Sequence, residues 1–279
     1  MKLSKMILSG LFAASLVFGF TGCAEEEDEN GMLKVSGSTC TIDYTNTSTD
    51  NYSRGFKSLK TKHYDAICKI SNTTTANKAS GDGVMGYIFA LTQNTDKTYN
   101  FGLAGVRNNN GTVQGYVSYF KNVSGKYLSS GKNFADSNGV LVGESDCLAT
   151  EVDITKAALS TTSWKELKTS AGKEFDIWID VIANDGKSTG RTGTKGSYTV
   201  TFYTSDPGRT TSASGSNTTY TDESGKVASY TVSADDTGLT EMTQLDLGFY
   251  ANVYSSSTLT GSWALSDIEG SGEPIEYID

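Results

Sequence analysis

Three neighbouring segments of alternating β-branched and aromatic residues constrain the fold of this chain more than any other feature. They span residues 84–91, 99–106 and 113–120. The last two are joined by the turn Asn108-Asn-Asn-Gly111, and an Asn-Gly turn favours a tight hairpin because both residues tolerate positive φ. Alternation with a period of two is typical of strands that bury one face. The sequence therefore predicts three consecutive antiparallel strands.

Further strand-like segments lie on both sides of these three. They cover residues 40–45, 64–70, 174–183, 197–204, 227–233, 244–254 and 258–268. The chain has 30 Gly but 2 Pro, which suits strands joined by tight turns. Ser163-Trp-Lys-Glu166 has the form of a capping box, which predicts one short helix within residues 151–170. We expect an all-β fold, a two-sheet antiparallel sandwich with one short helix, in which residues 32–279 form a single domain.

A Ser/Thr/Gly-rich stretch from Ser205 to Gly225 interrupts this strand pattern. Loops of about 20 residues within a compact domain are usually functional or disordered. We expect disorder or a surface flap rather than a functional loop. Aromatic residues also recur along the strands at 116–120 and 249–254, where one parity must face outward unless another layer covers it. We favour coverage over an aromatic binding platform.

The N-terminus has the features of an export signal. Lys2 and Lys5 precede an apolar run over residues 6–20. The run has about 15 residues, fewer than the ~20 that a helix needs to cross a bilayer. A basic start, a short apolar run and small residues at its end are typical of secretory signals. We therefore expect residues 1–22 to be a signal peptide.

The signal ends in Phe20-Thr-Gly-Cys23, which resembles a bacterial lipobox with Phe where Leu is usual, a variation found in spirochaetal lipoproteins. The resemblance implies that Cys23 is acylated and anchors the chain to a bilayer of the cell envelope, with the outer membrane the expected membrane. An ordinary signal peptide followed by a chance Cys is the plainer alternative. Residues 24–31 include five carboxylates in a row, so residues 23–31 should form a solvated, lipidated tether.

The charge balance excludes some partners. The chain has 23 Lys and Arg against 32 Asp and Glu, a net charge of −9 and a pI near 4.7. Nucleic-acid binding needs clustered Lys and Arg to contact phosphates, so we expect no nucleic-acid partner. The absence of a polybasic patch leaves lipid as the expected membrane contact.

The remaining cysteines are Cys40, Cys68 and Cys147. Exported proteins meet an oxidising compartment, which permits a disulfide and leaves one Cys over. Cys40 and Cys68 lie on strands that we expect to be adjacent, so we expect them to pair. The alternative is that all three are small buried side chains. Zinc is not expected, because the Cys spacing is unsuitable and His63 is the only histidine.

The segment Glu174-Phe-Asp-Ile-Trp-Ile-Asp180 is the main candidate site. Because side chains alternate along a strand, Glu174, Asp176, Trp178 and Asp180 should share one face, with the apolar residues between them on the other. A tryptophan can stack on the apolar face of a sugar while carboxylates bind its hydroxyls. We therefore consider Glu174, Asp176 and Trp178 as glycan-binding residues. The plainer interpretation is a solvent-facing strand.

The same segment is similar to the Glu-x-Asp-x-Glu strand of laminarinase-like retaining glucanases. This chain departs from that pattern, because Trp178 and Asp180 stand where the second catalytic Glu would be. Retaining hydrolysis needs two carboxyl groups about 5–5.5 Å apart. If the chain were a hydrolase, its candidate catalytic residues would be Glu174, Asp176 and Asp180.

Two wider resemblances concern the fold and the location. The segments at 247–252 and 263–268 resemble the jelly roll of concanavalin A-like lectins and glucanases, which implies a two-sheet sandwich. The segments at 86–92, 98–107 and 115–123 are similar to a group of treponemal envelope lipoproteins without an assigned role. That similarity implies an envelope lipoprotein and supplies no catalytic residues.

Other chemical features are weaker. Jelly-roll lectins often hold structural calcium, and Asp235-Asp-Thr-Gly238 and Asp136-Ser-Asn138 could supply oxygen ligands. Turn chemistry alone accounts for such acidic turns. His63 follows Lys60-Thr-Lys62 in an expected polar turn, which suits a surface histidine better than a general base. We expect no other cofactor.

The sequence contains no recognisable catalytic motif. Together with the features above, this favours a lipid-anchored bacterial envelope lipoprotein. We expect a non-enzymatic binding or adhesion module, whose partner is a glycan or a host or envelope protein. The alternatives are a glycoside hydrolase acting on a polysaccharide and a purely structural envelope lipoprotein.

Overall fold

The computed structural model describes twelve parts of the chain. They are residues 26–27, 31–47, 52–63, 65–72, 83–93, 95, 98–109, 112–124, 150–152, 175–212, 217–241 and 245–269. Cys23, Cys147 and Glu174 lie outside these parts. So do the capping box at 163–166 and the Asp136 turn.

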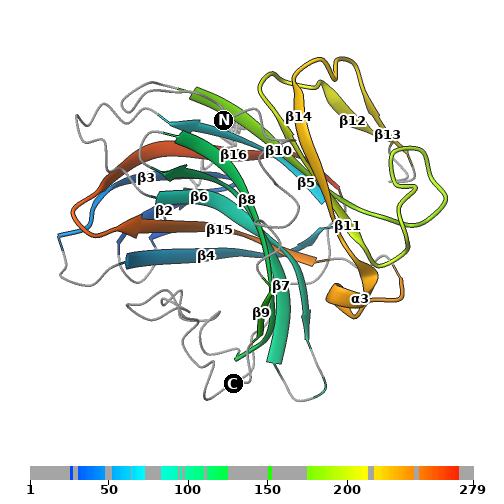
Figure 1. Ribbon diagram of the computed structural model, residues 1–279, viewed down its shortest axis with the longest axis horizontal. Coiled ribbons are helices and arrows are strands. Elements are labelled where there is room, and N and C mark those ends of the chain that lie inside the picture. Colours follow the sequence, from blue (N-terminus) through cyan, green and yellow to red (C-terminus); the bar gives the residue numbers. More distant parts are fainter. Residues whose placement is uncertain are drawn as a thin grey trace, which may run out of the picture.

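The described strands form two large antiparallel sheets and one small hairpin (Figure 1). The eight-stranded sheet has, in spatial order, β1 (Glu26–Glu27), β2 (Leu33–Ser36), β3 (Thr39–Thr45), β16 (Thr258–Glu269), β5 (Asp65–Asn72), β10 (Phe175–Ala183), β11 (Tyr198–Tyr203) and β14 (Lys226–Val232). The six-stranded sheet has β4 (Tyr52–His63), β15 (Leu245–Tyr254), β6 (Gly83–Gln93), β7 (Thr98–Asn109), β8 (Thr112–Ser124) and β9 (Thr150–Val152). The hairpin pairs β12 (Arg209–Thr211) with β13 (Thr218–Tyr220).

The three consecutive strands expected from the sequence are β6, β7 and β8, and they pair antiparallel as predicted. Every other expected strand is also present. The strand β4 was not expected, and its sequence explains why. Its Lys-rich pattern lacks regular alternation, and it lies at the edge of its sheet, where charged residues discourage pairing with other molecules. His63 ends this strand instead of lying in a turn.

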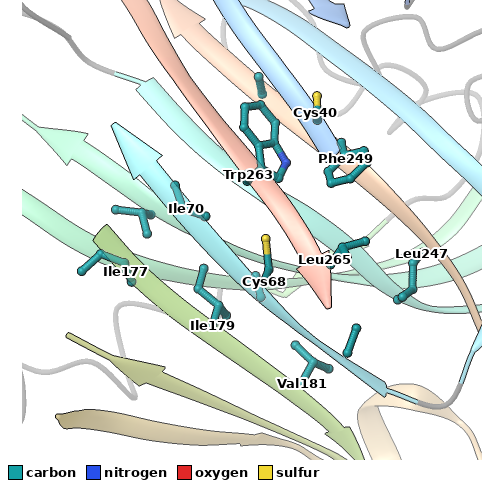
Figure 2. Packing of buried hydrophobic residues seen from close by; sticks show 14 of the residues in the cluster. Cys40, Cys68, Ile70, Ile177, Ile179, Val181, Leu247, Phe249, Trp263 and Leu265 are labelled. Atoms are coloured by element: carbon teal, nitrogen blue, oxygen red, sulfur yellow. The ribbon is translucent and has the colours of Figure 1, made fainter. Parts of the chain in front are cut away.

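The two large sheets pack against each other as a β-sandwich, as the strand pattern predicted. One continuous apolar cluster takes side chains from both sheets, including Ile179 and Cys68 from one and Val106 and Val253 from the other. Trp263 of the larger sheet meets Phe249 of the smaller sheet edge-on, with ring centroids 5.9 Å apart (Figure 2). Burying these faces supplies the main stabilisation of such a fold.

The expected Cys40–Cys68 disulfide is absent, and both side chains are free, buried thiols. The strand β16 lies between β3 and β5, so that Cys40 is opposite Trp263 and Cys68 is opposite Leu265 (Figure 2). Two strand spacings and an offset of two residues along the strands put the Cα atoms of the cysteines about 12 Å apart, whereas a disulfide needs less than about 7 Å. Burial, and secondarily Cys40, raises the pKa of the Cys68 thiol well above its ordinary value.

Three smaller expectations concern the ends and the helix. Within the expected acidic tether, Glu26 and Glu27 form the strand β1, which pairs with β2 opposite Val35 and Lys34. Within the expected helical segment, the first described residues belong to β9, and the described helix is α3 (Ala234–Thr237). Among the described residues, no helix is long and apolar enough to cross a bilayer.

Apolar and aromatic side chains on the outer face of the smaller sheet are buried where the structure describes them. Phe249 points into the core, and its neighbour Tyr250, of opposite parity, is nevertheless buried. Phe101 and Leu103 are buried as well, although they do not belong to the inter-sheet cluster. These positions agree with coverage of both faces and do not support an aromatic platform on this sheet.

Candidate functional site

The candidate site begins with the alternation of β10. Ile177 and Ile179 point into the core, and Asp176, Trp178 and Asp180 lie on the opposite, outer face, as the sequence predicted. Their burial differs along the strand, since Asp176 is exposed, Trp178 is partly exposed and Asp180 is 1% exposed. The outer face of β10 therefore changes from an open surface to a covered one within four residues.

At the open end, Lys69 of β5 links the tryptophan to the first carboxylate. Lys69 lies directly opposite Trp178 across the strands, and its ammonium group is 5.2 Å from the centre of the indole ring. The same ammonium group forms an ion pair with Asp176 at 3.0 Å. Cation–π contacts of this kind hold a lysine against an aromatic face. Trp178 thus lies beside the Lys69–Asp176 ion pair and has part of its ring in solvent.

Asp176 is an ionised hydrogen-bond acceptor at neutral pH. Partial burial, the largest effect, tends to raise the pKa of its carboxyl group, but a 2.5 Å hydrogen bond from Ser71 and the Lys69 ion pair together lower this pKa below its ordinary value. A carboxylate with a lowered pKa is a poor general acid. It is well suited to accept hydrogen bonds from hydroxyl groups.

At the covered end, Asp180 binds groups from a separate hairpin. The hydroxyl of Tyr220 donates to one carboxylate oxygen at 2.6 Å, and the guanidinium of Arg209 lies 3.4 Å from the other. Both partners belong to β12 and β13, which we call the strap. Asp180 therefore attaches the strap to the outer face of the sheet.

Arg209 also binds a second carboxylate. One of its terminal nitrogens contacts Asp65 of β5, and Arg191 reaches the other oxygen of Asp65 at 2.8 Å. Arg191 in turn donates to the backbone carbonyl of Ala183 at 3.2 Å. The four charged side chains are at most 1% exposed, and the two guanidinium groups balance the two carboxylates. Buried charges are tolerated when they are paired in this way.

The described residues of the Ser/Thr/Gly-rich stretch, 205–212 and 217–225, are ordered and are not disordered as one expectation had it. Besides the ionic contacts of the strap, Thr218 donates its backbone N–H to the carbonyl of Thr189, in the loop that follows β10. Gly190 allows this approach, because a Cβ at that position would lie 2.4 Å from the Thr218 carbonyl oxygen. The other expectation was a surface flap, and the strap does lie over the outer face of the sheet, where it is held in a fixed position (Figure 1).

Aromatic rings join the open end of the site to the strap. Tyr203 of β11 is directly opposite Trp178 on the same face, and its ring centroid is 6.1 Å from that of Tyr220. Tyr203 is buried, whereas Trp178 and Tyr220 are both partly exposed. Burial first, and the charge of Asp180 second, raise the pKa of both tyrosines well above the ordinary value.

Sequence reasoning found half of this arrangement. It identified Asp176, Trp178 and Asp180 but missed Asp65 and the strap residues. A signal was present, because the chain has four arginines among its 23 basic residues and two of them lie in Gly/Ser/Thr-rich stretches. Arginine is the preferred cation for buried, two-armed ion pairs. In this chain, arginines within Gly/Ser/Thr-rich stretches therefore mark the places where a loop is attached to the sheet.

The remaining candidates do not converge on this site. Thr237, in the Asp235–Gly238 turn, is buried and its hydroxyl donates to the Gly196 carbonyl at 2.7 Å, while Asp235 is exposed. No group of three or more His, Cys, Asp or Glu side chains in the described parts of the chain is placed to hold a metal ion. The short helix α3 accounts for the acidic turn structurally.

Comparison with known proteins assigns no family to this chain. No protein-family profile and no curated protein match this sequence. Among solved structures, the chain is similar to the alginate lyase from Klebsiella pneumoniae, with 14% identity and a TM-score of 0.28. The similarity covers 75% of this chain and 60% of that enzyme. The assignment of the fold rests on the sheet order described above.

Proposed function

We propose that this chain is a lipid-anchored envelope protein that binds a glycan without cleaving it. The observation that carries this proposal is the partly exposed ring of Trp178, flanked by Asp176 and Lys69 on the outer face of β10 and β5. A partly exposed ring beside an acceptor and a donor suits a sugar, which has an apolar face and a rim of hydroxyls.

The positions of the carboxylates support binding over hydrolysis. Asp176 and Asp180 are four residues apart on one strand, so their Cα atoms are about 13 Å apart. Glycosidases place their two carboxyl groups about 5–5.5 Å or about 6.5–9.5 Å apart. Asp180 is also buried against Arg209 and Tyr220. Its interactions suit attachment of the strap, and the hydrolase alternative would need Glu174 with Asp176.

The lipid anchor at Cys23 remains part of the proposal. Two residues, Ala24 and Glu25, separate Cys23 from β1, and these three residue steps give a reach of about 10 Å between the acylated residue and the edge of the larger sheet. The strand β10 lies five strand positions from β1, or about 24 Å across the sheet. An anchored chain would therefore hold its binding face at some distance from the bilayer, where a glycan can reach it.

A glycan array tests the binding proposal directly. The chain without residues 1–23 should bind at least one glycan, and Trp178→Ala should reduce that binding at least tenfold. Thr231→Ala, on an exposed position of β14, is the matched control and should bind normally. Binding that survives Trp178→Ala would contradict the proposal. A protein partner in place of a glycan would appear as an array without hits and a Trp178-dependent contact with envelope or host proteins.

A reducing-sugar assay on every hit separates binding from hydrolysis. We expect no release of reducing ends. Release that Glu174→Gln abolishes would replace the binding proposal with the hydrolase alternative. No binding and no release would favour a structural lipoprotein.

Lipidation is tested separately in the bacterial host. Metabolic labelling with a tagged fatty acid should label the chain, and Cys23→Ser should remove the label and release the protein from the membrane fraction. A labelled Cys23→Ser variant would contradict lipid attachment at this residue.

A further inference from the structure

The row of aromatic rings continues beyond Trp178 onto the strap. Trp178 and Tyr203 are a cross-strand pair, and the Tyr220 ring centroid lies 6.1 Å from that of Tyr203. Directly opposite side chains are separated by about 5 Å, so Trp178 and Tyr220 both lie next to Tyr203. The two ends of the row are partly exposed, and Tyr203 is buried between them. One sugar unit on Trp178 would leave the Tyr220 end uncovered.

The strap holds the second exposed ring in a fixed position. The Tyr220 hydroxyl donates to Asp180 at 2.6 Å, and Arg209, on the paired strand, bridges Asp180 and Asp65. The side chains of the Arg209 bridge are buried, so solvent does not compete with its ion pairs. A ring fixed before a ligand arrives loses little freedom on binding, which favours affinity.

The charges along the row cancel. Asp176 is paired with Lys69 at 3.0 Å, and Glu223, beyond Tyr203, is paired with Lys226 at 3.4 Å. Asp180 is paired with Arg209 beneath the strap. A surface with balanced charges has no net attraction for an acidic polysaccharide and suits a neutral one.

We infer that the binding surface has two subsites, one at Trp178 and one at Tyr220 on the strap, and that its ligand is a neutral glycan chain of several sugar units. This inference rests on the proposed glycan-binding function and extends it to the length and charge of the ligand. The buried Arg209 bridge positions the second subsite.

The test compares ligand length in solution. Glucose, mannose and the hexasaccharides of β-glucan and mannan are titrated against the full chain in detergent, with an alginate hexasaccharide as the acidic probe. We expect one neutral hexasaccharide to bind at least tenfold more tightly than its monosaccharide and than the alginate probe. Tyr220→Ala should remove this gain.

Tyr220→Phe keeps the ring and is the second variant, so that loss of folding in Tyr220→Ala does not decide the outcome. It should retain at least half of the gain from chain length. A gain that is the same in wild type and Tyr220→Ala, while Trp178→Ala abolishes binding, would overturn the second subsite and leave the proposed function standing. Tighter binding of the alginate probe would overturn the neutral ligand. No binding of any probe would overturn both proposals.

Discussion

At the scale of single residues, the buried charges beneath the strap are the most informative feature. Arg209 contacts both Asp65 and Asp180, and Arg191 contacts Asp65 from the other side. Replacing one member of a buried ion pair is costly because its partner stays behind as an uncompensated charge. An exposed pair of the same length contributes little, because water screens it.

Arg209→Met should therefore reduce the free energy of unfolding by about 3–5 kcal/mol. Lys195→Met is the matched control, since Lys195 forms a 2.7 Å pair with Glu241 on the exposed surface, and it should cost less than about 1 kcal/mol. Urea unfolding of both variants measures the difference. Equal losses in the two variants would show that the strap contributes no more than a surface contact.

The raised pKa values of Tyr203 and Tyr220 predict that stability depends on alkaline pH. Burial, followed by the charge of Asp180, raises the pKa of Tyr203 and Tyr220 above the unfolded value of about 10, so their stabilising effect is complete below that pH. It is lost as the pH rises above about 10, because the unfolded state then releases protons more readily. Unfolding free energy should fall more steeply above this pH in wild type than in the variant Tyr203→Phe/Tyr220→Phe.

The absorbance of phenolate provides the direct measurement. In the native protein, wild type and the double Phe variant should give the same absorbance change near pH 10–11. In denaturant, the double variant should lose the contribution of both tyrosines. A native wild type that already ionises both groups near pH 10 would refute the assigned burial.

At the scale of elements, the strap shows how a loop becomes ordered. Its strands are three residues each, too short to be stable as an isolated hairpin. It is held instead by side chains that reach the sheet and by the approach of β13 to the loop at Gly190. A few specific contacts thus order the strap, whereas an ordinary strand is held mainly by burying the apolar side chains of an alternating pattern.

Gly190→Ala should displace the strap. Gly190 has φ +78°, and an added Cβ would lie 2.4 Å from the Thr218 carbonyl oxygen. We expect a loss of about 2–4 kcal/mol, from backbone strain and from overpacking. Gly238→Ala is the control, because Gly238 has φ +70° with nothing within 4 Å, and should lose about 1–2 kcal/mol from strain alone.

Hydrogen exchange locates the effect as well as its size. Amides of β12 and β13 should exchange faster in Gly190→Ala than in Gly238→Ala, with the protection of β7 unchanged. Identical exchange of the strap in the two variants would contradict its attachment through the loop at Gly190.

At the scale of the whole molecule, the sequence predicted the elements better than their neighbours. The alternation along β10 correctly placed Trp178 and Ile177 on opposite faces of the sheet, because the side-chain period is a local property. The insertion of β16 between β3 and β5 is a long-range pairing that no local pattern encodes. The expected Cys40–Cys68 pair failed for this reason, and so did the interpretation of the strap, whose order depends on Asp65 far along the chain.

The thiol state of the cysteines follows from the sheet order. Alkylation of the unreduced, denatured protein should modify both Cys40 and Cys68, and peptide mapping should find each with one alkyl group. Reduction before alkylation is the control for completeness. A cross-linked peptide containing both residues would mean that β16 does not lie between their strands.

A crystal structure with a bound neutral hexasaccharide tests most directly whether the outer face of β10 and the strap bind a glycan. We expect one sugar unit stacked on Trp178, hydroxyls bound to Asp176 and Lys69, and a further unit against Tyr220 with Arg209 still bridging its two carboxylates. A hexasaccharide bound elsewhere on the molecule, with Trp178 uncovered, would contradict this proposal.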